Sequence, residues 1–115
     1  MYLFFDTETT GLPRNLKAPV TDLNNWPRLV QLAYLYYDEN GSKISGGDFI
    51  VKPEGYTIPK DASRIHGIST EKALKEGVPI SNVLQNFQSF VEEAKILVAH
   101  NMSFDEKIIG AEFLR

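Results

Sequence analysis

The sequence predicts one α/β domain built on a mixed β-sheet. Three observations predict it: an apolar run at residues 2–5, two strand-like segments around Asn40-Gly41, and helical periodicity in the second half. The resulting order is strand, hairpin pair, helices, strand, helix, in which the hairpin supplies the antiparallel part of the sheet. With 115 residues and 43% hydrophobic content, the chain can form one core and is too short for two.

The first strand and the segment after it differ sharply in composition. Tyr-Leu-Phe-Phe at residues 2–5 is an unbroken apolar run, typical of a central strand covered on both faces. Residues 13–27 contain three prolines and three asparagines and show no regular period. We therefore expect a long surface loop there, which either shapes access to a site or is a tolerated insertion.

A β-hairpin is the clearest local prediction. Residues Leu29–Tyr37 are rich in β-branched and aromatic side chains, and Ile44–Val51 continue as the partner strand. Asn40-Gly41 between them is the typical signal for a two-residue hairpin turn. Gly46-Gly47 in the second arm predicts a bulge or a close approach of another group to the backbone.

The next segments are predicted to be helical. Residues Pro59–Ile65 fit one or two turns, and Thr70–Glu76 fit a short helix stopped by Gly77 and Pro79. Ser81 is placed to cap a longer helix. The apolar stripe of that helix would pack on the sheet and consists of Val83, Leu84, Phe87, Phe90 and Val91.

The chain closes with a strand and a helix. Residues Ile96–Ala99 form a second apolar strand, and Ser103–Glu106 resemble a capping box that opens a helix through Phe113. No further strand follows to pair with Ile96–Ala99, so we expect residues 1–115 to be the N-terminal portion of a domain that is incomplete at its C-terminus.

Charge and composition exclude several kinds of protein. A net charge of −3 argues against long, salt-driven wrapping of nucleic acid, but it leaves room for a small grip on a nucleic-acid end. Without cysteine there are no disulfides and no thiolate metal sites. The apolar run at residues 2–5 lacks a basic leader and is too short to span a membrane, so we expect a cytoplasmic protein with no membrane partner.

Acidic residues follow the two predicted apolar strands. If the first strand reaches residue 8, its period of two places Asp6 and Glu8 on the same face. Parallel neighbouring strands would bring this pair close to the segment after Ile96–Ala99, which contains Asp105. Three converging carboxylates repel one another unless a hard cation such as Mg²⁺ or Mn²⁺ binds between them.

Simpler interpretations remain open at this point. Asp6 and Glu8 could be solvated acids at a strand end, and Asp105 could only stabilise the first turn of a helix. His100 could hydrogen-bond to backbone, and Asn101 could cap a helix. Gly11 is expected to adopt a positive φ angle that turns the backbone away after Glu8.

Four segments in order resemble the DEDD-type 3′-to-5′ exonuclease family, which includes the proofreading subunit of bacterial DNA polymerase III. They are "FDTETTGL" at residues 5–12, "RLVQLA" at 28–33, "IPKDASRIHGIS" at 58–69 and "HNMSFD" at 100–105. The resemblance spans essentially the whole chain, and four ordered motifs are far more specific than any one of them. It implies a ribonuclease-H-like mixed sheet with flanking helices.

The resemblance also implies roles for single residues. Asp6, Glu8 and Asp105 would be the catalytic metal ligands, with Asp6 bridging two Mg²⁺ or Mn²⁺ ions. Hydrolysis of a phosphodiester at the 3′ end of DNA or RNA would follow a two-metal mechanism with ions roughly 4 Å apart. The residues implied to contact the terminal nucleotide are Thr7, Thr9, Leu12, Asp61, His66 and Asn101, with Leu12 as an apolar wedge against the base.

One part of the family pattern is absent from the sequence. The family needs a third motif, with a His or Tyr general base and a fourth acid, on a helix after Asp105. Beyond Asp105 the sequence offers only Glu106 and Glu112, and neither His nor Tyr. We therefore expect an inactive or weakly active chain; whether the complete enzyme would use His or Tyr, and act on DNA or RNA, stays open.

Two other functions compete with the exonuclease. The first is a non-catalytic module that binds a nucleic-acid end or a DNA polymerase subunit, which the missing motif allows. The second is an aspartyl-phosphate phosphatase with Asp6 as nucleophile. That class needs a second Asp where this chain has Glu8, and a downstream Lys, so it is the weakest of the three.

Overall fold

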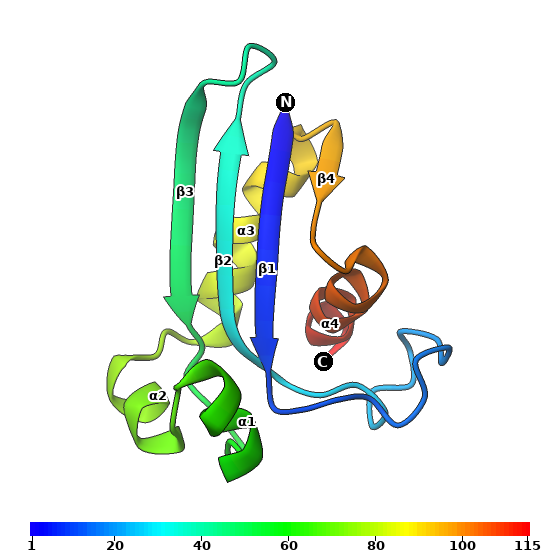
Figure 1. Ribbon diagram of the computed structural model, residues 1–115, viewed down its shortest axis with the longest axis vertical. Helices are drawn as coiled ribbons and strands as arrows, with labels where there is room; N and C mark the ends of the chain where they lie inside the picture. The colour runs from blue at the N-terminus through cyan, green and yellow to red at the C-terminus, as the bar shows by residue number, and fades with distance from the viewer.

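The computed structural model describes all residues, 1–115. Its centre is a four-stranded sheet with the order β3-β2-β1-β4 (Figure 1). The strands are β1 (Tyr2–Thr9), β2 (Leu29–Tyr37), β3 (Lys43–Ile50) and β4 (Ile96–Val98), and the helices are α1 (Lys60–His66), α2 (Thr70–Glu76), α3 (Ile80–Glu93) and α4 (Met102–Leu114).

The sheet is mixed, as the sequence predicts. β1 runs antiparallel to β2 and parallel to β4, so it is the central strand between a hairpin and a crossover connection. β4 pairs only with residues 2–4 of β1. Beyond residue 4, β1 has no strand partner on this side, and α4 lies beside its second half (Figure 1). Asp6 and Glu8 belong to that unpaired part of the strand.

One face of the sheet carries the core. α3 lies across this face, behind the sheet in the view of Figure 1, and α4 packs on the same side through buried Ile108. The aromatic centre of the core is formed by Phe87 of α3, whose ring lies 5.3 Å from Phe5 and 5.4 Å from Tyr34 in tilted or edge-on contact. The apolar stripe predicted for α3 therefore packs on the sheet as expected.

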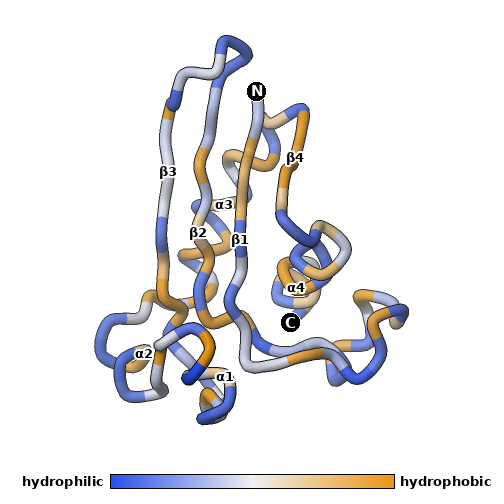
Figure 2. Tube along the Cα trace, viewed as in Figure 1, coloured by the Kyte–Doolittle hydropathy of each residue, from blue (hydrophilic) through white to orange (hydrophobic).

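The opposite face of the sheet has no helix on it. Phe4 is 41% exposed and Leu35, its cross-strand partner, is equally exposed. Figure 2 shows hydrophobic colour along β4 and the first half of β1, which changes to hydrophilic farther along β1. The expectation that β1 is covered on both faces is therefore wrong for the described chain, because α3 and α4 lie on the same side.

The hairpin forms where predicted, but its turn is longer than two residues. Strand pairing stops at Tyr37 and Lys43, and Asp38 Oδ1 accepts hydrogen bonds from the backbone N–H groups of Asn40 and Ser42. Asp38 therefore organises a larger turn, in which Gly41 takes the positive φ of 82°.

The paired glycines of β3 mark a close approach and not a bulge. A methyl group at Gly47 would lie 2.7 Å from the ring of Tyr34, and the register stays regular at both glycines. The register shift of this hairpin falls between Tyr36 and Tyr37 instead. Gly47 therefore leaves room for an aromatic ring beside the strand.

The helices form where the sequence predicts them, whereas two predicted caps do not form. α2 has the expected bounds, and the Ser69 hydroxyl accepts from the Lys72 N–H. α3 begins at Ile80 after Pro79, so Ser81 lies inside the helix and does not cap it. α4 begins at Met102, one residue before the proposed capping box, and has no side-chain cap. No helix is long and apolar enough to span a membrane.

The predicted surface loop at residues 13–27 is docked on α4. The Trp26 indole is buried and donates to the Pro19 carbonyl at 2.9 Å. Lys107 of α4 lies 5.4 Å from the centre of the Trp26 ring, and its Nζ donates to the Leu16 carbonyl at 3.3 Å. The loop is therefore part of the packed structure.

Candidate active site

The alternation of β1 separates its polar side chains onto two faces. Leu3, Phe5, Thr7 and Thr9 are buried on the helix side, whereas Asp6 is exposed on the uncovered side. Glu8, two residues on, shares the face of Asp6 and is half-buried. The prediction that Asp6 and Glu8 share a face is confirmed. Neither acid takes part in an ion pair.

Asp105 approaches β1 from the helix side. Its carboxylate is 3% exposed and accepts a hydrogen bond of 2.5 Å from the hydroxyl of Thr7. The backbone N–H of Asp105 donates to the Asn101 carbonyl, which places it in the first turn of α4. Thr7, the residue between the two acids of β1, is therefore the direct link between this strand and α4.

Burial dominates the electrostatics of Asp105. It raises the pKa of this carboxyl above its ordinary value, and repulsion from Asp6 acts in the same direction. The hydrogen bond from Thr7 and those from backbone N–H groups oppose this shift. Burial is thus the main reason for the raised pKa of Asp105, and the charge of Asp6 adds to it.

The predicted convergence of three carboxylates does not occur as one cluster. No group of three Asp, Glu or His side chains surrounds a common point. The physical reason is the strand period: Thr7 faces α4, so Asp6 and Glu8 face away from it. The donor set still fits a hard divalent cation in kind, since Asp6 and Glu8 offer carboxylate oxygens that no cationic side chain neutralises.

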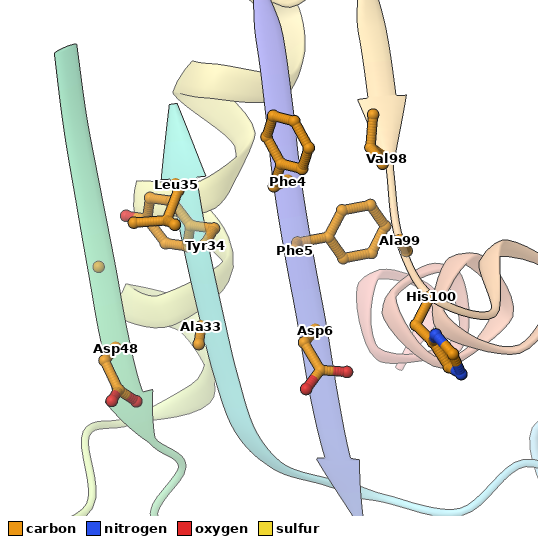
Figure 3. Close-up of a pocket in the computed structure, with 11 residues that line it drawn as sticks. Phe4, Phe5, Asp6, Ala33, Tyr34, Leu35, Asp48, Val98, Ala99 and His100 are labelled. Atoms are coloured by element: carbon orange, nitrogen blue, oxygen red, sulfur yellow. The ribbon is translucent and has the colours of Figure 1, made fainter. Parts of the chain in front are cut away.

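Asp6 lies at one end of a shallow hollow on the uncovered face. The hollow has a volume of about 430 Å³, and its lining includes Phe4, Leu35 and Val98. Figure 3 shows the Asp6 carboxylate and the His100 imidazole at the same end of it, from β1 and from the segment after β4. Neighbouring parallel strands thus bring these two polar side chains together, as their order in the sequence predicts.

The turn after β1 explains two further predicted residues. The Thr9 hydroxyl donates to the Gly11 carbonyl at 2.7 Å, so it stabilises the turn. Gly11 has φ +156°, and a methyl group added there would meet open space, so its role is conformational. Leu12 follows with 87% of its side chain exposed, which leaves it free to contact another molecule.

Both ring nitrogens of His66 are engaged with backbone. Nδ1 accepts from the Ile68 N–H at 3.1 Å, so the proton belongs on Nε2, which donates to the Thr9 carbonyl at 3.2 Å. His66 therefore connects the end of α1 to the end of β1. This matches the simpler interpretation of a histidine that packs a loop, and contact with a nucleotide stays a prediction.

The other two residues predicted to contact a nucleotide, Asp61 and Asn101, lie at the surface. The Asp61 side chain is almost fully exposed and meets only Arg64, at 4.0 Å. Asn101 is exposed at the N-cap of α4, where its carbonyl accepts from the Phe104 and Asp105 N–H groups while its side chain makes no cap. The structure does not bring Asp61 or Asn101 into contact with Asp6 or Glu8.

The sequence analysis names Glu112 and Arg28 but does not predict that they pair. Glu112 is buried on α4 and binds Arg28, which precedes β2. A signal is present in the sequence, because Glu112 lies seven residues after Asp105 and therefore on the same helical face. Glu112 is thus already paired and does not supply the missing fourth metal-binding acid.

Comparison with known proteins gives relatives of one kind. The chain is 35% identical over 114 residues to the PolC-type DNA polymerase III of Streptococcus mutans and 34% identical to that of Streptococcus pyogenes. Each match covers 99% of this chain and 7% of the relative, so the chain corresponds to a small part of those polymerases.

Solved structures share the fold. Escherichia coli exonuclease I in complex with a dT13 oligonucleotide superimposes with a TM-score of 0.78 at 24% identity, over 98% of this chain and 23% of the other. The product-bound form of exonuclease I gives the same TM-score, over 25% of that chain. The sheet, its flanking helices and their order thus form a ribonuclease-H-like fold. With the sequence profile of the Exonuclease family matching residues 3–115, the chain belongs to that family.

Proposed function

We propose that this domain removes nucleotides from the 3′ end of DNA or RNA by hydrolysing the terminal phosphodiester. The observation that carries the proposal is the pair Asp6 and Glu8, two carboxylates without ion pairs at the end of the central strand in an Exonuclease-family fold. Asp105, joined to the strand through Thr7, is the third acid. Asp6 and Glu8 would bind Mg²⁺ or Mn²⁺ directly, and Asp105 would do so through water. The ions would supply an activated water and neutralise developing charge.

The likeness to other proteins supports a nucleic-acid substrate. The structural neighbours include exonuclease I bound to oligonucleotides, and the sequence relatives are DNA polymerases. We therefore propose a nucleic-acid 3′ end as substrate and a DNA polymerase as the partner. Divalent ions at the site would carry most of the contact to the scissile phosphate, which is compatible with a net charge of −3.

We further propose that the 115-residue chain is a nearly inactive form of the domain. It has neither His nor Tyr after Asp105, and Glu112 is held by Arg28 and Arg115. A general base is typically worth about 10² to 10⁴-fold in rate. Rapid Mn²⁺-dependent release of mononucleotides from single-stranded DNA by this chain would contradict the proposed impairment.

The metal site is tested by calorimetry with Mn²⁺. We expect binding by the unmodified chain and loss of that binding in Asp6→Asn, which removes one ligand charge without changing the side-chain shape. Glu76→Gln is the matched control, because Glu76 is exposed on α2 and the charge change is the same. Equal Mn²⁺ binding by Asp6→Asn and Glu76→Gln would reject the site.

A second candidate function is supported by the exposed side chain of Leu12, which follows the acids of β1 in the chain. A module that binds a nucleic-acid end without cleaving it needs the acids and the exposed Leu12, but no general base. Fluorescence anisotropy with a labelled single-stranded oligonucleotide and Mn²⁺ would detect this. Binding without cleavage, by the chain and by a version extended with the missing motif, would favour the binding module over the exonuclease.

A further inference from the structure

The buried face of α4 has an acid at each end. Asp105 and Glu112 are separated by seven residues, or two helical turns, with Ile108 and Ile109 between them in the core. Asp105 meets β1 through Thr7. Glu112 has no part in the proposed chemistry, so its burial needs another explanation.

The burial of the Glu112 carboxylate costs free energy. The residue is 4% exposed, and its Oε1 accepts from Arg28 Nε at 2.9 Å and pairs with Arg115. Its other oxygen, Oε2, is buried without a hydrogen-bond partner. Buried ion pairs with unsatisfied atoms contribute little net stability compared with apolar packing, so stability alone is a weak reason for this group.

Arg28 links Glu112 to the end of β1. Its backbone carbonyl accepts from the Thr10 N–H and its N–H donates to the Thr10 hydroxyl, both at 3.0 Å. Its guanidinium lies 4.3 Å from the centre of the Tyr56 ring, and the Tyr56 hydroxyl donates to the Leu29 carbonyl. Arg28 is therefore fixed on several sides before it binds Glu112.

The buried face of α4 reaches the first part of the chain twice, at Thr7 directly and at Thr10 through Arg28. From Thr7 to Thr10, the residue after β1, the extended chain rises about 10 Å, at roughly 3.3 Å per residue. From Asp105 to Glu112 the helix rises about 10 Å, at 1.5 Å per residue. We propose that Glu112 is a positioning residue: its contact with Arg28 fixes the register of α4 along β1 and so holds Asp105 against Thr7, the residue between Asp6 and Glu8.

The consequence for Asp105 follows from helix geometry. A slip of one residue would rotate the helix by about 100° and move it about 1.5 Å, which takes the Asp105 carboxylate away from Thr7. The contact at Thr7 and the burial of Ile108 hold the helix near Asp105, and the contact of Glu112 with Arg28 holds it at the other end of the same face. The catalytic meaning of the placement rests on the function proposed above, but the placement itself does not.

The test compares Glu112→Gln with Glu106→Gln on the same helix. Both variants remove one negative charge, but Glu106 is exposed. The readout is the NMR cross-relaxation between the Thr7 methyl group and the Asp105 β-protons, measured where both variants are fully folded. We expect this signal to fall several-fold in Glu112→Gln and to stay unchanged in Glu106→Gln. An unchanged signal in Glu112→Gln would overturn the proposal.

Mn²⁺ binding is the second readout. If the acids form a metal site, we expect Glu112→Gln to lower the affinity for Mn²⁺ by about tenfold or more, as loss of a supporting contact typically does. The Glu106→Gln variant should bind Mn²⁺ as the unmodified chain does. Mn²⁺ binding by Glu112→Gln equal to that of the unmodified chain would count against positioning. If even the unmodified chain binds no Mn²⁺, the proposed function falls while the NMR signal still decides the role of Glu112.

A second variant covers the case in which Glu112→Gln does not fold. Arg28→Lys keeps the positive charge beside Glu112 but removes the planar guanidinium that reaches Oε1 and Tyr56. We expect the same loss of the signal between Thr7 and Asp105. Persistence of that signal in a folded Arg28→Lys chain would show that Asp105 does not depend on this contact.

Discussion

At the scale of single residues, Thr7 is the contact on which the site depends. The hydroxyl of this inward-facing residue is the direct hydrogen-bond donor to a carboxylate that is almost completely buried. A buried acceptor that loses its donor bears the cost of desolvation, which is larger than the net gain from an average hydrogen bond. Thr7 therefore matters to stability as well as to the placement of Asp105.

Replacing Thr7 by Val removes the hydroxyl and keeps the shape. We expect the free energy of unfolding to fall by about 1–3 kcal/mol, because the Asp105 carboxylate is left without this donor. Urea denaturation followed by circular dichroism measures the change. Thr57→Val is the control, since Thr57 is exposed. A loss no greater than that of Thr57→Val would show that the contact is absent in solution.

The pH dependence of stability reports on Asp105. Burial raises its pKa in the folded chain above the ordinary 3.8, so the folded state binds the proton more tightly than the unfolded state. The stabilisation from that proton is complete below the unfolded pKa and is lost as pH rises through the folded pKa. Ionisation of Asp105 therefore costs stability.

The variant Asp105→Asn removes this titration. We expect it to gain stability relative to the unmodified chain as pH rises from about 3 to about 7, whatever its offset at the acid end. Urea denaturation at a series of pH values, with EDTA present to exclude metal ions, measures the difference. A constant difference across the series would contradict the raised pKa.

At the scale of elements, the sequence predicts positions better than ends. The bounds of β2 and α2 match because strong signals lie next to them: Pro27 before β2, and Ser69 and Gly77 at the two ends of α2. β4 ends one residue early and β1 extends to Thr9, beyond its apolar run. Such limits depend on partner strands, which local sequence does not encode.

The sequence also predicts only part of the candidate site. The period of a strand predicts that Asp6 and Glu8 share a face, but it does not say on which face the helices pack. That choice depends on α3 and α4, which come later in the chain. It puts Thr7 next to Asp105, and it leaves Asp6 and Glu8 on the other side. The pairing of Arg28 with Glu112 spans 84 residues and has no local signal.

α3 is held to the sheet by its aromatic contacts. Phe87 is buried against Phe5 and Tyr34, so Phe87→Ala would leave a cavity between helix and sheet. We expect a loss of about 3–5 kcal/mol in the free energy of unfolding, measured by urea denaturation. Gln85→Ala, at an exposed position of the same helix, should change it little. Similar losses in both variants would exclude this packing.

At the scale of the whole molecule, the loop at residues 13–27 and α4 form one unit. Besides the contacts of Lys107, Gly110 of α4 lies so close to Val20 that an added methyl group would come within 2.8 Å of it. Arg115 donates to the carbonyls of Leu23 and Trp26, both at 2.8 Å. The loop thus packs along the helix that carries Asp105.

The single tryptophan, Trp26, reports on this unit. Because its indole is buried in the docked loop, we expect Trp26 fluorescence and far-ultraviolet circular dichroism to change at the same urea concentration, as in a two-state transition. Far-ultraviolet signals follow the sheet and helices, so they serve as the internal reference. A Trp26 transition at lower urea would mean that the loop detaches before the core unfolds.

The uncovered face of the sheet also governs how the chain behaves in solution. Phe4, Leu35 and Ile96 are each more than 40% exposed on this face, so part of the apolar surface stays in contact with water. Sulfate salts strengthen the burial of such surface. Concentrated samples should therefore scatter more light in ammonium sulfate than in sodium chloride of equal ionic strength, and Phe4→Ser should reduce the difference. Solubility of this chain would then be limited by one side of its sheet and not by its net charge.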